Sequence, residues 1–334
     1  MDRSDDGVSD VGSTPPVGVL VMAYGTASGP EDIERYYTDI RGGRPPSPEH
    51  LEELRARYAA IGNRFPLLEI TRRQAEGLEG ALNTGDGDRF RTYLGMKHSA
   101  PFVAEAVEEM RNDGIRRAVG IVMAPHWSQM SVESYADRVR AAVEDGSPAF
   151  AFVRGYHDHP AFVALLADRV AGALGRLMPA ERETAAVVFS AHSLPVRTLE
   201  DGSSRCRDCH VCEARCAYGR ALVETGDLVA AELDLAHHTI GWQSAGRTAD
   251  PWWGPPLEEV IADLAAAGHR AVVVCSAGFV SDHLEILYDL DIEASALAEQ
   301  ADIRLVRTEM PNDDPAFVAV LADVVRAHVP ASPD

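Results

Sequence analysis

The chain has 334 residues, of which 46% are hydrophobic, 25% charged and 7% aromatic. This composition excludes global disorder, and the length suggests two domains of about 150 residues each. A formal net charge of −21 argues against nucleic acid and anionic lipid as partners, because like charges repel. No apolar run approaches the roughly 20 residues that a membrane span needs, so we expect no membrane span.

The predicted elements alternate between short strands and amphipathic helices. Residues 1–15 are acidic and lack an apolar stretch, which indicates a disordered tail and not a signal peptide. Strands are predicted at 17–23, 91–95, 118–124 and 149–153, and again at 185–191, 238–244, 271–277 and 303–307. These runs are almost continuously apolar, which is typical of parallel strands buried on both faces. The alternation predicts an α/β protein with two parallel sheets flanked by helices.

Chemistry in such sheets gathers just beyond the C-terminal ends of the strands. The residues found there include Tyr24 and the pair Lys97–His98 in the first half, and His192 in the second. The chain contains no GxGxxG, GxxxxGK[ST], GxSxG or HExxH motif. Nucleotide-dependent, serine-hydrolase and zinc-protease chemistry therefore lose their main sequence support.

The stretch 281–294 carries three carboxylates at a spacing of four residues, namely Glu285, Asp289 and Glu293. On a helix this spacing drifts by only about 40° per step, so the three side chains line one face. Such a row is a path for a divalent cation. The alternative from periodicity alone is a solvated acidic face that serves solubility.

His192 stands between Ser190 and Ser193 at a predicted strand end. It could be a metal ligand, a general base or a buried structural imidazole. A serine–histidine nucleophile pair is disfavoured, because residues so close in sequence rarely place Oγ on the imidazole and no glycine-framed turn surrounds them.

Arginines follow in a glycine-rich loop and on the next predicted helix. Arg41 and Arg44 flank two glycines, and Arg57 precedes Tyr58. In so acidic a chain, arginines near a strand-end cleft are candidates for binding carboxylate or phosphate. Ordinary surface arginines are the alternative.

Four of the five cysteines fall in one short segment, at Cys206, Cys209, Cys212 and Cys216. This density favours a reducing cytoplasmic compartment over a secreted disulfide scaffold. The C-x2-C-x2-C-x3-C spacing indicates an iron–sulfur cluster, with zinc (and His210 as a spare ligand) or free thiols as alternatives. Cys275 lies in an apolar run and is expected to pack in the core.

A series of motifs occurs in order along the chain, namely VMAYGT (21–26), IRGGRPPSPE (40–49), RYAAIG (57–62), LGMKHSAPF (94–102), APHWS (124–128), SVESYADR (131–138), FSAHSLP (189–195), GWQSAGRTADPWWGP (241–255) and GFVSDHLEILYD (278–289). Taken together, these motifs resemble the ferrochelatase family in its bacterial coproporphyrin III type. The resemblance runs from about residue 17 to 329. It implies a lyase that inserts Fe²⁺ into coproporphyrin III in haem biosynthesis, within a porphyrin cleft between two Rossmann-like domains.

The resemblance also implies domain boundaries. We expect domains at 16–155 and 156–312, a cysteine insertion at 203–217, and a helix at 313–329 that packs on the first domain. Members with such cysteines hold a [2Fe–2S] cluster, which is the cofactor we expect here, with a [4Fe–4S] cluster or zinc as alternatives.

The same resemblance assigns roles to individual residues. His192 and Glu285 match the catalytic pair at the point where metal enters the macrocycle, and Asp289 and Glu293 continue the iron path. The substrate-binding positions are Tyr24, Arg41, Arg57, Tyr58 and Tyr135, and Lys97 and His98 match a metal-interacting pair. His192, with an ordinary pKa of about 6.5, would be mostly neutral at pH 7 and would accept pyrrole protons.

One departure concerns substrate choice, because Phe65 stands where many relatives place a small hydroxyl residue. The alternatives to the coproporphyrin function are a protoporphyrin IX ferrochelatase, a non-catalytic haem or porphyrin carrier, and a cluster-based redox sensor. A transient contact with neighbouring haem-pathway enzymes is also considered.

Overall fold

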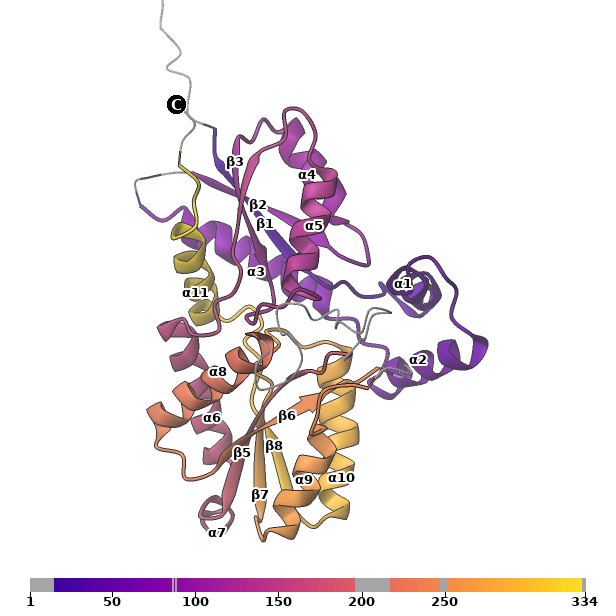
Figure 1. Ribbon diagram of the computed structural model, residues 1–334, viewed down its shortest axis with the longest axis vertical. Coiled ribbons are helices and arrows are strands. Elements are labelled where there is room, and N and C mark those ends of the chain that lie inside the picture. The colour runs from indigo at the N-terminus through magenta and orange to yellow at the C-terminus, as the bar shows by residue number, and fades with distance from the viewer. Residues whose placement is uncertain (1–14, 86, 88, 196–216, 247–250, 332–334) are drawn as a thin grey trace, which may run out of the picture.

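The computed structural model describes residues 15–85, 87, 89–195, 217–246 and 251–331. Two four-stranded sheets stand one above the other along the long axis of the molecule (Figure 1). We call residues 15–153 the first half and residues 185–307 the second half, because each contains one sheet. No helix in the described ranges is long and apolar enough to cross a membrane.

The first sheet has the order β2-β1-β3-β4, and all its strands are parallel. Its strands are β1 (Val17–Ala23), β2 (Phe90–Met96), β3 (Arg117–Val122) and β4 (Ala149–Phe152). Every residue of β1 is buried, as expected for a central strand covered by helices on both faces.

The second sheet repeats this order as β6-β5-β7-β8, again with parallel strands. Its strands are β5 (Ala185–His192), β6 (His238–Gln243), β7 (Ala271–Cys275) and β8 (Arg304–Arg307). The predicted fold class is therefore confirmed, and Cys275 is buried in β7 as expected.

Helices connect the strands and cover both sheets. They are α1 (Ile33–Ile40), α2 (Pro48–Ala60), α3 (Leu67–Leu82), α4 (Val103–Asn112), α5 (Val132–Ala142), α6 (Pro160–Gly175), α7 (Pro179–Arg182), α8 (Ala217–Leu233), α9 (Leu257–Ala266), α10 (Ser295–Gln300) and α11 (Pro315–Arg326). A 3-10 turn, η1 (Pro30–Asp32), precedes α1, and a π-helix, η3 (Glu285–Ala294), precedes α10. Figure 1 shows α1 and α2 standing to one side at the level where the two halves meet.

The last helix, α11, leaves the second half and packs against α3 of the first. A Cβ added at Gly77 of α3 would lie 3.2 Å from a methyl group of Val318, so the two helices approach closely at this glycine. The Phe317 ring of α11 also lies 6.2 Å from the Phe162 ring of α6. One apolar core thus continues from the first sheet into the second.

Candidate active site

His192 and Glu285 meet where the second half faces the first. His192 is the last residue of β5, and Glu285 is the first residue of η3. His192 Nε2 lies 3.5 Å from Glu285 Oε1, and the two side chains are 34% and 31% exposed. The loop after β7 passes so close to β5 that a Cβ at Gly278 would lie 2.4 Å from the Ala191 Cβ. Only glycine allows this approach, which brings the following segment up to His192.

Glu285 also contacts a second imidazole, which the sequence patterns did not indicate. His283 Nε2 lies 3.5 Å from Glu285 Oε2, while His283 Nδ1 donates to the Ser281 carbonyl at 2.9 Å. On the other side, His192 Nδ1 donates to the Ser193 carbonyl. Each imidazole is thus fixed by a backbone carbonyl and presents its Nε2 to the same carboxylate.

The charges of this cluster differ from our expectation. Burial alone would lower the pKa of His192, but the adjacent Glu285 carboxylate outweighs it and raises that pKa to about 9. Burial would likewise raise the pKa of Glu285, but His192 and His283 outweigh it and hold that pKa well below its usual range. The prediction of an ordinary His192 pKa was therefore wrong, because the partner carboxylate stabilises the imidazolium.

The acidic row lies on a π-helix, in which hydrogen bonds join residue i to residue i+5. Asp289, one step beyond Glu285, is 5% exposed. It accepts from Ser244 Oγ and from Arg57 Nη2 of α2. Burial raises the pKa of Asp289 to about 6 although Arg57 opposes this shift. Glu293 lies at the exposed end of the row.

The first half contributes aromatic and cationic groups. The strand-end segment after β2 runs beside Tyr24, because the His98 amide donates to the Tyr24 carbonyl at 3.0 Å. The Tyr24 and His98 rings lie 4.6 Å apart. Lys97 Nζ donates to Ser134 Oγ at 2.6 Å and lies 5.0 Å from the Tyr135 ring. Burial, assisted by Arg138, lowers the pKa of Lys97 to about 8.

The predicted substrate-binding residues are placed in different ways. Arg41, at the end of α1, has a buried Nε atom without a hydrogen-bond partner among the described residues. Arg57 is paired with Asp289 and lies over the Tyr288 ring at 4.7 Å. Tyr58 is buried, and its ring stacks on Phe65 at 4.5 Å. Of these two arginines, Arg41 therefore has an N–H donor without a partner among the described residues, whereas Arg57 is already paired with the Asp289 carboxylate.

The serines beside His192 make no nucleophile pair. Ser190 Oγ donates to Gln243 Oε1 at 2.8 Å, and Ser193 Oγ donates to the Trp253 carbonyl at 2.9 Å. Neither hydroxyl is bonded to the imidazole, as the sequence predicted. The cysteine set at 206, 209, 212 and 216 lies outside the described residues.

Comparisons with known proteins place the chain among its relatives. The family model named ferrochelatase matches residues 16–329. The chain is 43% identical to the coproporphyrin III ferrochelatase of Geobacillus kaustophilus, over 92% of this chain and 94% of that protein. It is 44% identical to the coproporphyrin III ferrochelatase of Anoxybacillus flavithermus, over 94% and 96% of the two chains.

A solved structure shares the fold at much lower sequence identity. The sirohydrochlorin chelatase SirB of Bacillus subtilis subspecies spizizenii, in complex with cobalt, aligns with a TM-score of 0.54 at 9% identity, covering 94% of this chain and 95% of that one. This likeness supports the architecture alone. Because the family model spans nearly the whole chain and these two relatives are 43% and 44% identical to it, the protein belongs to the ferrochelatase family.

Proposed function

We propose that this protein is a lyase that inserts Fe²⁺ into coproporphyrin III, forming iron coproporphyrin III in haem biosynthesis. The observation that carries the proposal is the His192–Glu285 pair, 3.5 Å apart. It lies in a chain that is 43% and 44% identical to two coproporphyrin III ferrochelatases. The reaction exchanges two pyrrole protons for one Fe²⁺. It therefore needs a base for the protons and a ligand that draws the metal out of water. The Glu285 carboxylate supplies the ligand, and His192 becomes a base for a pyrrole proton once it has released the proton that this carboxylate stabilises.

The acidic row supports delivery of the metal to that pair. Glu293 is exposed, Asp289 is buried, and Glu285 contacts His192. Carboxylates in this order offer successive oxygen ligands to a divalent cation moving inwards. Asp289 is the intermediate position, and its pKa of about 6 leaves it mostly ionised at neutral pH.

The first half supplies groups that suit a porphyrin carrying carboxylates. The orphaned Nε of Arg41 fits a propionate, because an unpaired buried donor gains most from a charged acceptor. Tyr24 is 43% exposed and adds ring surface and a hydroxyl group, and Lys97 adds a cation, whereas Tyr58 and Tyr135 are buried behind this surface. We assign Arg57 to the same porphyrin-binding surface of the first half, although its partner in the structure is Asp289.

The decisive experiment offers coproporphyrin III and protoporphyrin IX in parallel, with Fe²⁺ under anaerobic conditions, and follows the Soret and Q bands. We expect rapid metallation of coproporphyrin III and little of protoporphyrin IX. The reverse preference would keep the enzyme class but revise the substrate. Binding of both porphyrins without metallation would replace the enzyme by a carrier.

We further propose that Cys206, Cys209, Cys212 and Cys216 hold a [2Fe–2S] cluster. The support is the donor set itself, since four closely spaced thiolates suit an iron–sulfur cluster, and such a cluster would add a redox-active group. The test is visible absorption and electron paramagnetic resonance of protein purified without oxygen. Cys209→Ser should remove the cluster signals, and a colourless wild-type protein with bound zinc would contradict the assignment.

The cellular setting follows the same reasoning. Closely spaced thiols persist in a reducing compartment, and we therefore propose the cytoplasm. A transient contact with the enzymes that precede and follow in the haem pathway stays a prediction.

A further inference from the structure

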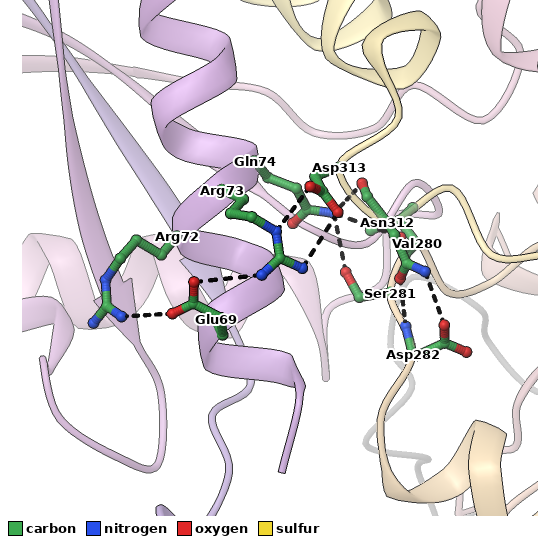
Figure 2. Close-up of polar contacts among 9 residues, drawn as sticks. All are labelled: Glu69, Arg72, Arg73, Gln74, Val280, Ser281, Asp282, Asn312 and Asp313. Atoms are coloured by element: carbon green, nitrogen blue, oxygen red, sulfur yellow. Dashed lines mark hydrogen bonds and ion pairs between the residues drawn. The ribbon is translucent and has the colours of Figure 1, made fainter. Parts of the chain in front are cut away.

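Gln74 lies where α3 of the first half touches the segment that leads to Glu285 (Figure 2). Its side chain is fully buried. The Nε2 group donates to Ser281 Oγ at 3.0 Å and to the Asn312 carbonyl at 2.8 Å, with the Val280 carbonyl at 3.5 Å. An amide nitrogen carries two N–H groups, and here both donate to residues outside the first half.

The segment 280–285 is held on its other side by Asn312. The Asn312 amide donates to the Val280 carbonyl at 2.8 Å, and its side chain exchanges two hydrogen bonds with Asp282, each of 2.8 Å. Gln74 therefore binds two loops that are also hydrogen-bonded to each other, one at Ser281 and the other at Asn312, as Figure 2 shows.

A short chain of contacts connects Gln74 to the catalytic carboxylate. Ser281 receives the Gln74 bond on its hydroxyl and accepts from His283 Nδ1 on its carbonyl at 2.9 Å. His283 Nε2 lies 3.5 Å from Glu285. Each of these groups is fixed by the one before it, so a shift of Ser281 would move His283 and Glu285 relative to His192.

Gln74 is an unfavourable residue type for its location. It lies on the buried face of α3 in line with Leu67, Ile70 and Leu78, where an apolar side chain would need no hydrogen bonds. Its Oε1 atom is buried and has no hydrogen-bond partner in the described part of the chain. A buried polar atom without a partner destabilises the fold, so the contribution of this amide lies in what its N–H groups hold.

We propose that Gln74 is a positioning residue for iron insertion: through Ser281 and Asn312 it fixes, from the first half, the segment that carries His283 and Glu285. The inference rests on the proposed function. It adds that the geometry of the catalytic pair depends on a side chain of the opposite half that touches neither member.

The test compares steady-state metallation by Gln74→Met, which keeps the length but has no donor, with Ser281→Ala and the double variant. We expect Gln74→Met to lower kcat about tenfold, because a small displacement of reacting groups has large kinetic effects. The KM for porphyrin should stay within about twofold of the wild-type value, since the residues proposed to bind the porphyrin are unchanged. The double variant should be no slower than the slower single variant, because both remove the same contact.

Arg73→Gln is the matched control. Arg73 is the neighbouring residue of α3 and pairs with Asp313 at 2.8 Å, but it is 42% exposed and none of its hydrogen bonds in Figure 2 reaches segment 280–285. We expect the kcat of Arg73→Gln to equal that of the wild type. Thermal unfolding, followed by circular dichroism, checks that every variant is folded. A wild-type kcat in Gln74→Met, or losses that multiply in the double variant, would overturn the inference. If the wild-type protein metallates no porphyrin, the proposed function itself fails before any variant is compared.

Discussion

The two halves of the molecule have the same strand order but different chemistry at their strand ends. The sheets β2-β1-β3-β4 and β6-β5-β7-β8 correspond strand for strand. Each also presents a histidine, His98 after β2 and His192 at the end of β5. Burial lowers the pKa of His98 although Asp39 contacts its Nδ1 at 2.7 Å, whereas Glu285 raises the pKa of His192 to about 9.

This difference in the strand-end residues shows that the fold determines where functional groups gather, whereas individual residues determine their chemistry. Parallel strands bring their carboxyl ends to one edge, so both halves place functional groups at the junction. The first half gathers rings, Lys97 and the arginines, which suits holding an aromatic anion. The second half gathers carboxylates around an imidazole, which suits protons and metal. We therefore expect binding and chemistry to separate between the halves.

The largest expected effect comes from the two histidines. His192→Ala should lower kcat for iron insertion by at least about 100-fold, because it removes a group from the proton-and-metal pair. His98→Ala should leave kcat within about threefold, although the resemblance matched it to a metal-interacting pair, since the contacts of its ring are to Tyr24 and Asp39 and not to His192 or Glu285. Stopped-flow absorbance measures the rates, and porphyrin fluorescence quenching checks that both variants bind. Equal losses of kcat in the two variants would contradict the separation of binding and chemistry between the halves.

A smaller effect is expected from Lys97. Lys97→Met should raise the KM for porphyrin about tenfold and change kcat little, because a charge-assisted contact to a propionate is worth about 1.5–3 kcal/mol. Initial rates over a range of porphyrin concentrations separate the two constants. A fall in kcat at unchanged KM would place Lys97 with the chemistry of the second half.

A different property, the pH dependence of folding stability, depends on His126, which follows β3 and lies with its Nε2 2.9 Å from Thr225 Oγ1 of α8. Burial lowers its pKa from 6.5 to about 3, so the folded protein binds this proton more weakly than the unfolded chain does. The resulting stability is complete above pH 6.5 and is lost as the pH falls towards 3, by about 1.4 kcal/mol per pH unit. His126→Gln should remove this part of the slope in urea unfolding between pH 6 and 4, and an unchanged slope would contradict the assignment.

The sheets could be predicted from the sequence because their strands are nearly continuous apolar runs, as in residues 17–23 and 271–275. The carboxylate row could be predicted from its spacing. The pairing of His192 with Glu285 rested on family resemblance, because the two lie far apart in the chain and no local pattern joins them. The raised pKa of His192 could not be foreseen, since it depends on that contact.

Other site residues left weaker signals. His283 lies two positions before Glu285, a spacing that puts it on no shared helical face, and it acts through a loop conformation. Gln74 did leave a trace, because it interrupts an apolar face that runs through Leu67, Ile70 and Leu78. A polar residue in such a place indicates a buried partner, but only the structure identifies Ser281 and Asn312.

The return of α11 to α3 has a consequence for how the protein is made. During synthesis β1–β4 and α3 leave the ribosome long before the helix that covers α3 around Gly77, because the whole second half is translated between them. The apolar surface of α3 that later meets Val318 therefore stays exposed to chaperones and to other nascent chains until α11 emerges. A ribosome that stops within α11 would thus release a chain in which α3 lacks its cover, and such a product should be an aggregation-prone substrate for proteases.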